Sequence, residues 1–213
     1  MYIPAQFKEQ DPDTLFQMIE HCPLGTLITH SEGTLDAIHI PFEINREEGE
    51  IGCLIGHVAR ANPVWRSVAN GDEVLVVFRG GDAYISPNWY PSKQQTHRQV
   101  PTWNYRAVHV RGQITFRQDE SFLRDVVAKL TKTHESTQPI PWSMEDAPAD
   151  YISAMLKAIV GVEIKILQIT GAMKLGQNKN ADDLRSAGEN VINAGNEIIG
   201  EAMLSHLKIK DSR

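Results

Sequence analysis

The chain has 213 residues, with 21 Lys or Arg against 27 Asp or Glu, so its formal net charge is -6 at pH 7. Hydrophobic residues make up 41% of it, which is enough to bury a core and excludes a disordered tail. Its longest aliphatic and aromatic run, Val74 to Phe78, is too short to span a membrane, and residues 1–8 lack the features of a secretory signal, so we expect a cytoplasmic protein with no membrane partner.

The first half of the chain indicates a helix followed by short strands. Residues 11–22 open with an Asp-Pro-Asp sequence typical of a helix start and place apolar residues at helical spacing, which predicts a helix ending before Pro23. β-branched runs separated by turn sequences predict strands at 25–30, 35–40 and 51–56. A short helix is expected from Asn62 to Asn70. Two further strands are expected at 73–78 and 83–86, separated by Arg79-Gly80-Gly81.

The second half continues with one long strand, two helices and a last strand. Residues 105–117 alternate apolar with polar side chains, as a half-exposed strand does. Residues 119–132 and 148–160 place apolar side chains at helical spacing, and residues 162–170 predict a strand that returns to the sheet. Six or seven strands with these helices predict a mainly β protein with helices (α+β), built on a small barrel.

The C-terminal residues 182–207 indicate a further helical stretch. Leu184, Val191 and Ile198 recur every seven residues, while three glycines weaken a helix there. Two interpretations stay open, namely a helix that packs with a partner chain and a peripheral helix on the chain's own surface. We divide the chain into a barrel domain at 1–180 and a C-terminal helical extension at 181–213.

Positive charge is concentrated in the middle of the chain. Residues 51–118 hold eight Lys or Arg against three acids, and residues 83–118 hold no acid but five Tyr or Trp. A basic region with aromatic side chains suits an anionic, planar ligand. Nucleic acid suits this chain less well because the whole protein is acidic. The alternative is a set of solvated arginines on strand faces.

The common nucleotide and catalytic motifs are absent. The sequence contains no GxGxxG, no P-loop, no GxSxG and no HExxH. The eight histidines form no pair with metal-ligand spacing, and Cys22 and Cys53 stand alone as expected reduced thiols, so no metal site is predicted. No catalytic acid, base or nucleophile can be chosen, and whether the protein is an enzyme stays open.

Three segments combine residue types that suit a ligand site. Segment 56–63 offers backbone N-H groups and the Arg60 guanidinium to one anion, although Asn62 could instead cap a helix that starts at Pro63. Segment 84–105 has rigid aromatic ends around a polar middle, which is typical of a lid, with a long hairpin loop as the alternative. Segment 171–179 is a basic strip after the last strand, or a plain linker.

These segments, with the Met1-Tyr-Ile-Pro opening and the run at 146–151, resemble the PaiB family of FMN-binding negative transcriptional regulators over roughly residues 1–180. The matching stretches are GHVARANP (56–63), AYISPNWYPSK (83–93), VPTWNY (100–105), IVGVEI (159–164) and KLGQNK (174–179). The resemblance implies an FMN-binding split β-barrel related to pyridoxamine phosphate oxidase. It also implies a homodimer with FMN at the subunit interface.

The same resemblance assigns site residues. It places Arg60 at the FMN phosphate, Trp103 and Asn104 near the flavin ring, and Lys174 with Gln177 in the site from the same or the other subunit. The complete set of cofactor-binding residues expected is His57, Val58, Arg60, Ala61, Asn62, Trp103, Asn104, Lys174 and Gln177. Gly176 stands where the family strip is expected to carry serine, and the lost hydroxyl would remove one hydrogen bond worth about 0.5 to 1.5 kcal/mol.

The implied function is negative transcriptional regulation through a flavin or small-molecule site. A flavin-dependent oxidoreductase is the alternative, since the flavin itself carries redox chemistry. A haem-binding split-barrel protein is a further alternative, with His57 or His109 as an axial ligand. DNA stays open as a partner, but no helix-turn-helix is legible and the acidic C-terminal residues would repel phosphate.

Overall fold

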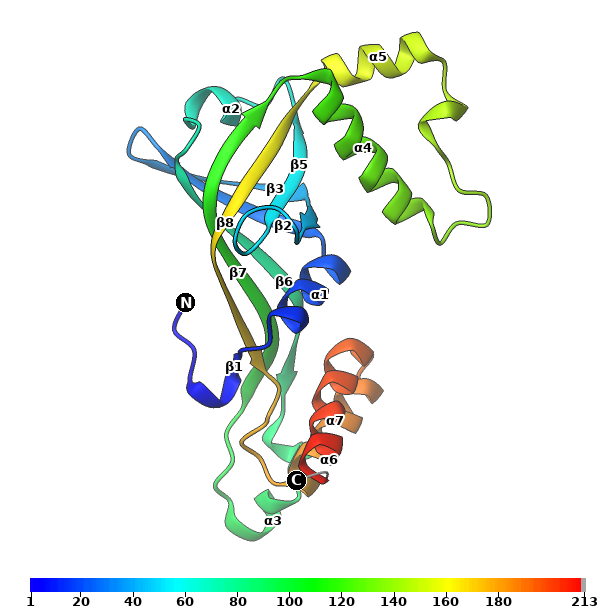
Figure 1. The fold of residues 1–213 in the computed structure, drawn as a ribbon. Helices are drawn as coiled ribbons and strands as arrows, with labels where there is room; N and C mark the ends of the chain where they lie inside the picture. Colours follow the sequence, from blue (N-terminus) through cyan, green and yellow to red (C-terminus); the bar gives the residue numbers. More distant parts are fainter. Residues whose placement is uncertain (212–213) are drawn as a thin grey trace. The chain divides into compact units, whose positions relative to one another are not determined.

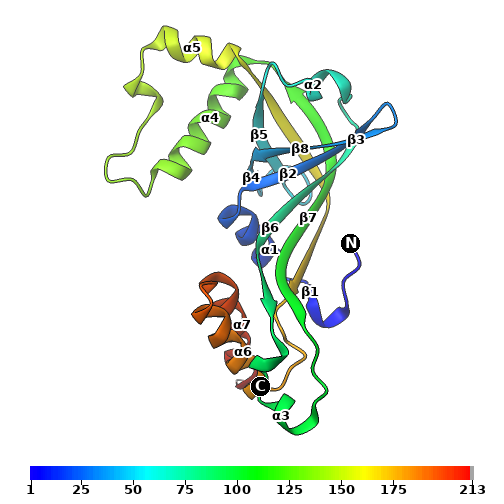
Figure 2. The ribbon, with the colours of Figure 1, turned by 180° about the vertical axis from the view of Figure 1, so that it is seen from behind.

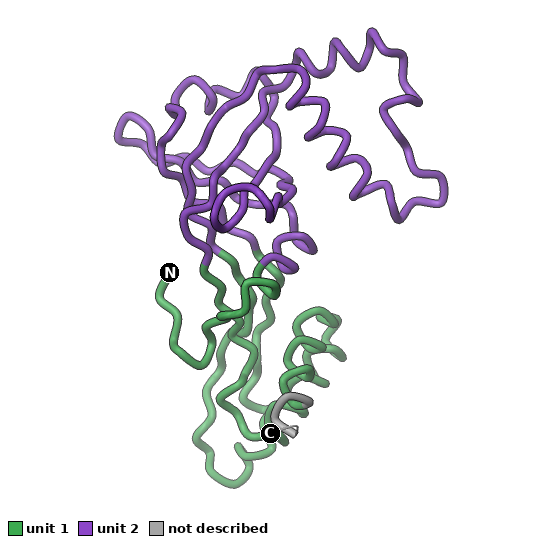
Figure 3. Tube along the Cα trace, viewed as in Figure 1, with its two compact units in different colours: residues 1–15, 79–108, 170–213 green, residues 16–78, 109–169 purple. Residues whose placement is uncertain are grey.

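The computed structural model describes residues 1–211, which group into two compact units (Figure 3). Unit 1 comprises residues 1–15, 79–108 and those from 170 onward, and unit 2 comprises residues 16–78 and 109–169. Each unit therefore combines segments that are distant in the sequence. The expected domain boundary at residue 180 falls inside the last segment of unit 1 and stays a prediction.

Eight strands form one sheet, in the order β3-β2-β6-β7-β8-β5-β4, with β1 paired to β8 (Figure 1). The strands are β1 (Lys8–Glu9), β2 (Leu24–Ser31), β3 (Thr34–Pro41), β4 (Glu43–Asn45), β5 (Cys53–Ala59), β6 (Glu73–Ile85), β7 (Thr102–Arg117) and β8 (Ile159–Lys174). The pairs β1–β8, β2–β3, β2–β6, β4–β5 and β5–β8 are antiparallel.

The helices follow the strands in chain order. They are α1 (Pro12–His21), α2 (Val64–Ser67), α3 (Ser92–Thr96), α4 (Glu120–Glu135), α5 (Ala149–Lys157), α6 (Ala181–Asn193) and α7 (Glu197–Asp211), with short 3-10 turns at Ala5–Phe7, Pro87–Trp89 and Met144–Asp146. The α+β architecture and the helices expected at 11–22, 119–132 and 148–160 are confirmed. The short β4 and helix α3 were not predicted.

Strand β6 joins two stretches that the sequence divides. The Arg79-Gly80-Gly81 turn signal was expected to end one strand, and this expectation was wrong because the ladder continues through it to Ile85. The Arg106 guanidinium donates from Nε and Nη2 to the Gly80 carbonyl at 3.0 and 2.8 Å. Pairing with a neighbouring strand thus overrides the local preference of two glycines for a turn.

The core of unit 2 is built from inward-facing side chains of its strands. Leu27, Leu54 and Val76 are fully buried, and the rings of Phe42 and Phe78 meet edge to face at 6.1 Å. A second cluster forms where α4 meets α5. It consists of Leu123, Ile152 and Leu156.

The C-terminal stretch forms two helices rather than one. The chain turns at residues 194–196, and α6 and α7 then pack together as a hairpin, as both ribbon views show (Figures 1 and 2). A Cβ at Gly200 would lie 2.8 Å from the Gly188 carbonyl oxygen, so these glycines permit a close crossing. The break also shifts the apolar repeat, because Ile199 is fully buried while Ile198 is exposed.

Within residues 1–211, no helix is long and apolar enough to cross a bilayer.

Candidate functional site

The predicted site residues fall into two groups. His57, Val58, Arg60, Ala61 and Asn62 belong to unit 2. Trp103, Asn104, Lys174 and Gln177 belong to unit 1. The first group is contiguous in the chain, and in the second group a hydrogen bond from Lys174 to Thr102 joins the segments at 102–104 and 174–177.

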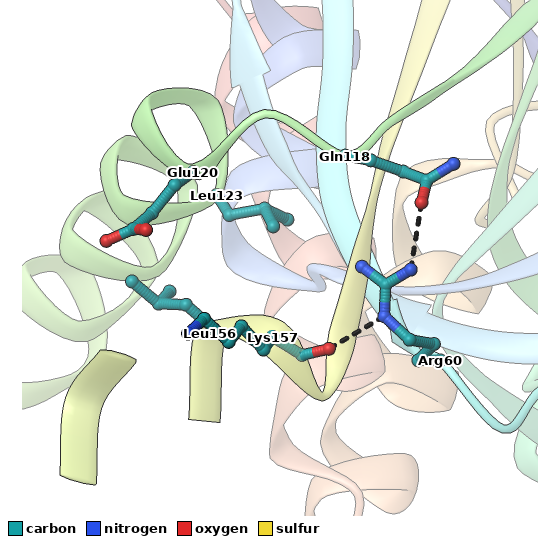
Figure 4. A pocket seen from close by; sticks show the side chains of 6 residues that line it. All are labelled: Arg60, Gln118, Glu120, Leu123, Leu156 and Lys157. Atoms are coloured by element: carbon teal, nitrogen blue, oxygen red, sulfur yellow. Dashed lines mark hydrogen bonds between the residues drawn. The ribbon is translucent and has the colours of Figure 1, made fainter. Parts of the chain in front are cut away.

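The Arg60 guanidinium is held by three acceptors at the end of β5. Nε donates to the Lys157 carbonyl at 2.7 Å, Nη2 to the Ile159 carbonyl at 3.0 Å and Nη1 to Gln118 Oε1 at 2.8 Å. Figure 4 shows the guanidinium pointing between Gln118 and the Lys157 carbonyl. A guanidinium has five N-H groups, so two stay available to a ligand. None of its three acceptors carries a charge.

A cavity of about 320 Å³ lies beside this guanidinium. It is lined by Arg60, Gln118, Glu120, Leu123, Leu156 and Lys157 (Figure 4). Glu120 pairs with Arg124 at 3.0 Å on the exposed side of α4. The lining therefore holds two cationic residues, an apolar pair and one carboxylate, that of Glu120, whose charge Arg124 offsets. The two cations favour an anionic group attached to carbon.

The other residues of the segment at 56–63 have local structural roles. The Asn62 side chain accepts a hydrogen bond at 3.0 Å from the N-H of Val64, the first residue of the short helix α2. Val58 is buried and Ala61 is exposed. Asn62 thus takes part in the strand-to-helix junction that was the alternative to a ligand contact, although the N-cap position itself is Pro63.

His57 presents a buried nitrogen that finds no protein partner among the described residues. Its Nδ1 makes no hydrogen bond, and burial lowers the pKa of the imidazole below its ordinary 6.5. His57 pairs with Gly161 across β5 and β8, and the Phe122 ring covers that glycine from α4. His57 therefore lies on the strand surface that α4 covers, where burial disfavours the protonated imidazole. Burial also lowers the pKa of His109.

In unit 1, the Lys174 ammonium donates to Thr102 Oγ1 at 2.6 Å. Burial lowers the pKa of Lys174 below its ordinary 10.5. Trp103, the next residue of β7, is 55% exposed and meets the Tyr84 ring at 6.0 Å. Because neighbouring residues of a strand point to opposite faces, the ammonium of Lys174 and the Tyr84–Trp103 pair lie on opposite sides of β7.

Asn104 points away from solvent. It is only 2% exposed, and its amide nitrogen donates to Met203 Sδ of α7 at 3.3 Å. Within unit 1 it therefore fastens β7 to the C-terminal hairpin, a contact that the sequence did not predict.

The strip at 174–179 is a structured turn. Gln177 Oε1 accepts from the Leu175 N-H at 2.9 Å, Gln177 Nε2 donates to the Met173 carbonyl, and the Lys179 N-H donates to the Gly176 carbonyl at 2.9 Å. Gly176 has a φ of +84°, in the left-handed region that favours glycine. The departure from serine at this position therefore has a backbone reason.

Asp183, which no sequence motif singled out, is a carboxylate that is 2% exposed at the start of α6. It accepts from the Ser92 N-H at 3.0 Å, from Ser92 Oγ at 2.7 Å, from Gln99 Nε2 at 3.4 Å and from Asn180 Nδ2 at 3.1 Å. Asn180 in turn accepts from the Asp183 N-H at 2.8 Å. The spacing of Asn180 and Asp183 matches a helix-capping pattern, which was the available signal.

These contacts define the middle of segment 84–105. Residues 92–96 form α3, and Lys93 donates to Asn88 Oδ1. Lys179 Nζ donates to Gln99 Oε1 at 2.7 Å and lies 4.6 Å from the centre of the Tyr90 ring. Burial, with a smaller contribution from Asp183, raises the pKa of Tyr90 to about 12. The stretch predicted as the moving part of a lid is thus tied to α6 by hydrogen bonds.

Most of the central arginines are engaged within the protein. Arg111 pairs with Glu73, Arg79 with Asp82, and Arg117 with both Asp119 and Glu163. The remaining side chains of this group include Arg66, which stacks on Trp65 at 4.6 Å, and the exposed Arg98. The charge excess counted in the sequence therefore overstates what these arginines offer to a ligand.

The family model described as "Putative FMN-binding domain" matches residues 1–168. The chain belongs to this family. It is 33% identical over 196 residues to the protease synthase and sporulation protein PAI 2 of Bacillus subtilis, covering 92% of this chain and 91% of that protein. An uncharacterized protein of Emericella nidulans is 30% identical over the full length of both chains. The resemblance to the PaiB family is confirmed, and FMN is confirmed as the cofactor by which the family is described.

Solved structures with the same fold are more distant in sequence. The flavocytochrome Anf3 of Azotobacter vinelandii matches with a TM-score of 0.60 at 13% identity, over 83% of this chain and 74% of that one. The FAD and heme binding protein of Mycobacterium smegmatis matches with a TM-score of 0.56 at 16% identity, over 88% and 80%. These likenesses confirm the predicted split-barrel fold. At 13% and 16% identity they concern the fold alone.

The residues present fit FMN in chemical type. A phosphate needs N-H donors with positive charge, and Arg60 keeps two such groups beside its cavity. A flat ring system needs exposed aromatic faces, and Tyr84 with Trp103 supplies them. Asn104 fits poorly, because its amide is buried against Met203.

Proposed function

We propose that this protein is an FMN-binding split-barrel flavoprotein that acts as a negative regulator of transcription through its flavin or small-molecule site. The observation that carries the flavin part is the exposed Tyr84–Trp103 ring pair, in a chain whose family is described as FMN-binding. The regulatory part is supported by the resemblance to the PaiB family.

Arg60 is the residue we propose for the FMN phosphate. Its three hydrogen bonds to neutral acceptors hold the guanidinium rigid without neutralising it. Because neutral acceptors leave the positive charge of the guanidinium in place, the two remaining N-H groups are suited to a phosphate oxygen.

Trp103 and Tyr84 are the residues proposed to contact the ring, and Lys174 with Gln177 the residues proposed to supply polar contacts. The bound flavin supplies the redox chemistry. Lys174 and Trp103 lie on opposite sides of β7. That arrangement supports a homodimer in which the lysine of one protomer serves the site of the other.

The test is a set of absorbance titrations with FMN, riboflavin and haemin, using the wild type and Arg60→Ala. We expect FMN to bind, riboflavin to bind at least about tenfold more weakly, and Arg60→Ala to remove most of that difference by weakening FMN alone. The matched control is Arg66→Ala, which removes a nearby exposed arginine that stacks on Trp65. Equal binding of FMN and riboflavin by the wild type would contradict the phosphate assignment.

Haem binding is tested in the same experiment. The buried, unpartnered Nδ1 of His57 is the observation that favours a haem alternative, since an axial ligand must be a neutral imidazole nitrogen. A Soret band that appears with haemin and disappears in His57→Ala would support haem and weaken the flavin proposal.

Direct contact with DNA is tested through the salt dependence of binding. Lys93 and the exposed Arg98 lie in the loop that contains α3. The slope of log K against log salt is negative. If both side chains contact phosphates, replacing them by Gln makes that slope less steep by about 1.8 for duplex DNA. An unchanged slope would exclude this loop as the contact and favour regulation through the flavin site.

A flavin-dependent oxidoreductase is the second candidate function. It predicts that the FMN-loaded protein is reduced by a nicotinamide donor faster than free FMN is. A rate equal to that of free FMN would leave the regulator as the better description.

A further inference from the structure

The Asp183 carboxylate accepts hydrogen bonds from three residues of unit 1. It is 2% exposed, and both of its oxygens accept hydrogen bonds. The donors come from Ser92, Gln99 and Asn180. Burying a carboxylate costs free energy unless the carboxylate is hydrogen-bonded. The position of α6, which carries Asp183, therefore depends on these donors.

The donors belong to two segments that the sequence separates by about 80 residues. Ser92 begins α3 and Gln99 follows it, whereas Asn180 is the N-cap of α6 and comes directly after the strip at 174–179. A second bridge joins the same segments, because Lys179 Nζ donates to Gln99 Oε1 at 2.7 Å. Gln99 Nε2 also donates to Ser92 Oγ at 2.8 Å, which closes the network. Moving Ser92, Gln99 or Asn180 therefore takes a hydrogen-bond donor away from the buried Asp183 carboxylate.

The network joins the region that the family model matches to residues that follow it. The match ends at residue 168, so it includes Ser92 and Gln99, whereas Lys179, Asn180 and Asp183 lie after it. The α6–α7 hairpin also contacts β7 through Met203 and Asn104, and its Asn196 donates to the Asp82 carbonyl at 2.7 Å. The hairpin is thus bonded to the same strands that carry Tyr84 and Trp103.

We propose that Asp183 is a positioning residue. It holds the loop that contains α3, through Ser92 and Gln99, and the strip that precedes α6, through Asn180. The α6–α7 hairpin therefore helps to set the shape of the ligand site. The effect on flavin rests on the proposed function, while the effect on the two segments does not. Without the Asp183 carboxylate, the α3 loop opens locally and the strip loses its fixed conformation.

The first experiment measures this opening on the protein without flavin. Trypsin cleaves the peptide bond between the exposed Arg98 and Gln99. The Gln99 side chain belongs to the network, so this bond is held in place while the network is intact. Proteases need a locally unfolded segment, so the cleavage rate reports how often the loop opens. We expect Asp183→Asn to raise cleavage at this bond by about tenfold or more. Cleavage after Lys132 in α4 of unit 2 serves as the internal reference.

The matched control is Asp182→Asn. Asp182 precedes Asp183 in the first turn of α6 and carries the same charge, but its side chain is 83% exposed and pairs only weakly with Arg185 at 3.4 Å. It should leave cleavage at Arg98 unchanged. Ser92→Ala should mimic Asp183→Asn, and the double variant should be no worse than the stronger single one, because both remove the same network.

Equal cleavage at Arg98 in Asp183→Asn and wild type, relative to Lys132, would overturn the proposal. Acceleration at both sites together would also overturn it, because it would indicate loss of the whole fold rather than of the loop's position. If Asp183→Asn becomes unstable, Ser92→Ala decides the question on its own, because Ser92 is half-buried and keeps its backbone bond to Asp183.

The second experiment measures FMN binding to the same variants. We expect Asp183→Asn and Ser92→Ala to weaken FMN and riboflavin by a similar factor, because the strip is proposed to act on the ring and not on the phosphate. Unchanged affinity for both flavins would overturn the role of the hairpin in the site. If the wild type itself binds no flavin, the proposed function fails while the cleavage experiment still decides whether Asp183 positions the loop.

Discussion

The Lys174 ammonium lies 2.6 Å from the hydroxyl of Thr102, so the contact joins the end of β8 to the start of β7, next to Trp103. A hydroxyl accepts the hydrogen bond but does not neutralise the charge. Burial accordingly lowers the pKa of Lys174 below 10.5. A lysine kept in these surroundings is suited to an anionic or electron-rich ligand rather than to stabilising the fold.

Lys174→Met should therefore separate folding from binding. The variant removes a poorly solvated charge, so its free energy of unfolding should equal or exceed that of the wild type, while its affinity for FMN falls. The unfolded chain binds the Lys174 proton more tightly than the folded protein does. Wild-type stability should thus rise relative to Lys174→Met as the pH increases from the lowered pKa toward 10.5. Urea denaturation at several pH values and flavin titration measure both effects, and a loss of stability with unchanged binding would contradict this interpretation.

His57 should make the protein sensitive to acid. Burial lowers its pKa below 6.5, so protonation is harder in the folded state than in the unfolded chain. The stability that neutral His57 contributes is complete above pH 6.5 and is lost as the pH falls through the lowered pKa. His57→Phe should flatten the dependence of unfolding free energy on pH in this window. The exposed His134→Gln is the control and should leave the dependence as in the wild type.

Arg60 should matter for stability as well as for phosphate. Arg60→Ala removes three hydrogen bonds from a charged donor, one of them to the carbonyl at the end of α5 and one to the carbonyl at the start of β8. We expect a loss of about 1.5 to 3 kcal/mol in unfolding free energy. Arg66→Ala, which removes only a stacking contact on Trp65, should cost less than about 1 kcal/mol. Chemical denaturation of both variants compares these values, and equal costs would mean that the three hydrogen bonds of Arg60 contribute little to stability.

Gly176→Ser should destabilise the protein although it restores the residue expected from the family strip. Its φ of +84° is a strained conformation for serine, and a Cβ would lie 3.0 Å from Leu184 Cδ1. We expect a cost of about 1 to 2 kcal/mol. Gly176→Ala provides the comparison, because it has the same backbone strain without a hydroxyl. If serine is clearly more stable than alanine, its hydroxyl finds a hydrogen bond that offsets part of the strain.

Local patterns in the sequence were sufficient for the elements that bury one face. The helices at 11–22, 119–132 and 148–160 were predicted because apolar side chains at helical spacing leave few alternatives, and the family was legible in ordered stretches such as GHVARANP. Arg60 could be selected for the same reason, since a basic residue at a strand end is visible in one dimension. The three acceptors of its guanidinium could not be selected, because Gln118, Lys157 and Ile159 lie 58, 97 and 99 residues further along the chain.

Tertiary structure decided the features that depend on distant pairing. The Arg79-Gly80-Gly81 turn signal gave way to a continuous β6 because neighbouring strands and the Arg106 guanidinium satisfy its backbone. In the sequence, Asp183 is one of several acidic residues of a C-terminal helix. In the structure it is buried, because Ser92 and Gln99 from the loop that contains α3 donate hydrogen bonds to it. A sequence pattern records the periodicity of one element, whereas the partner of a buried polar group is chosen by whatever element the fold places beside it.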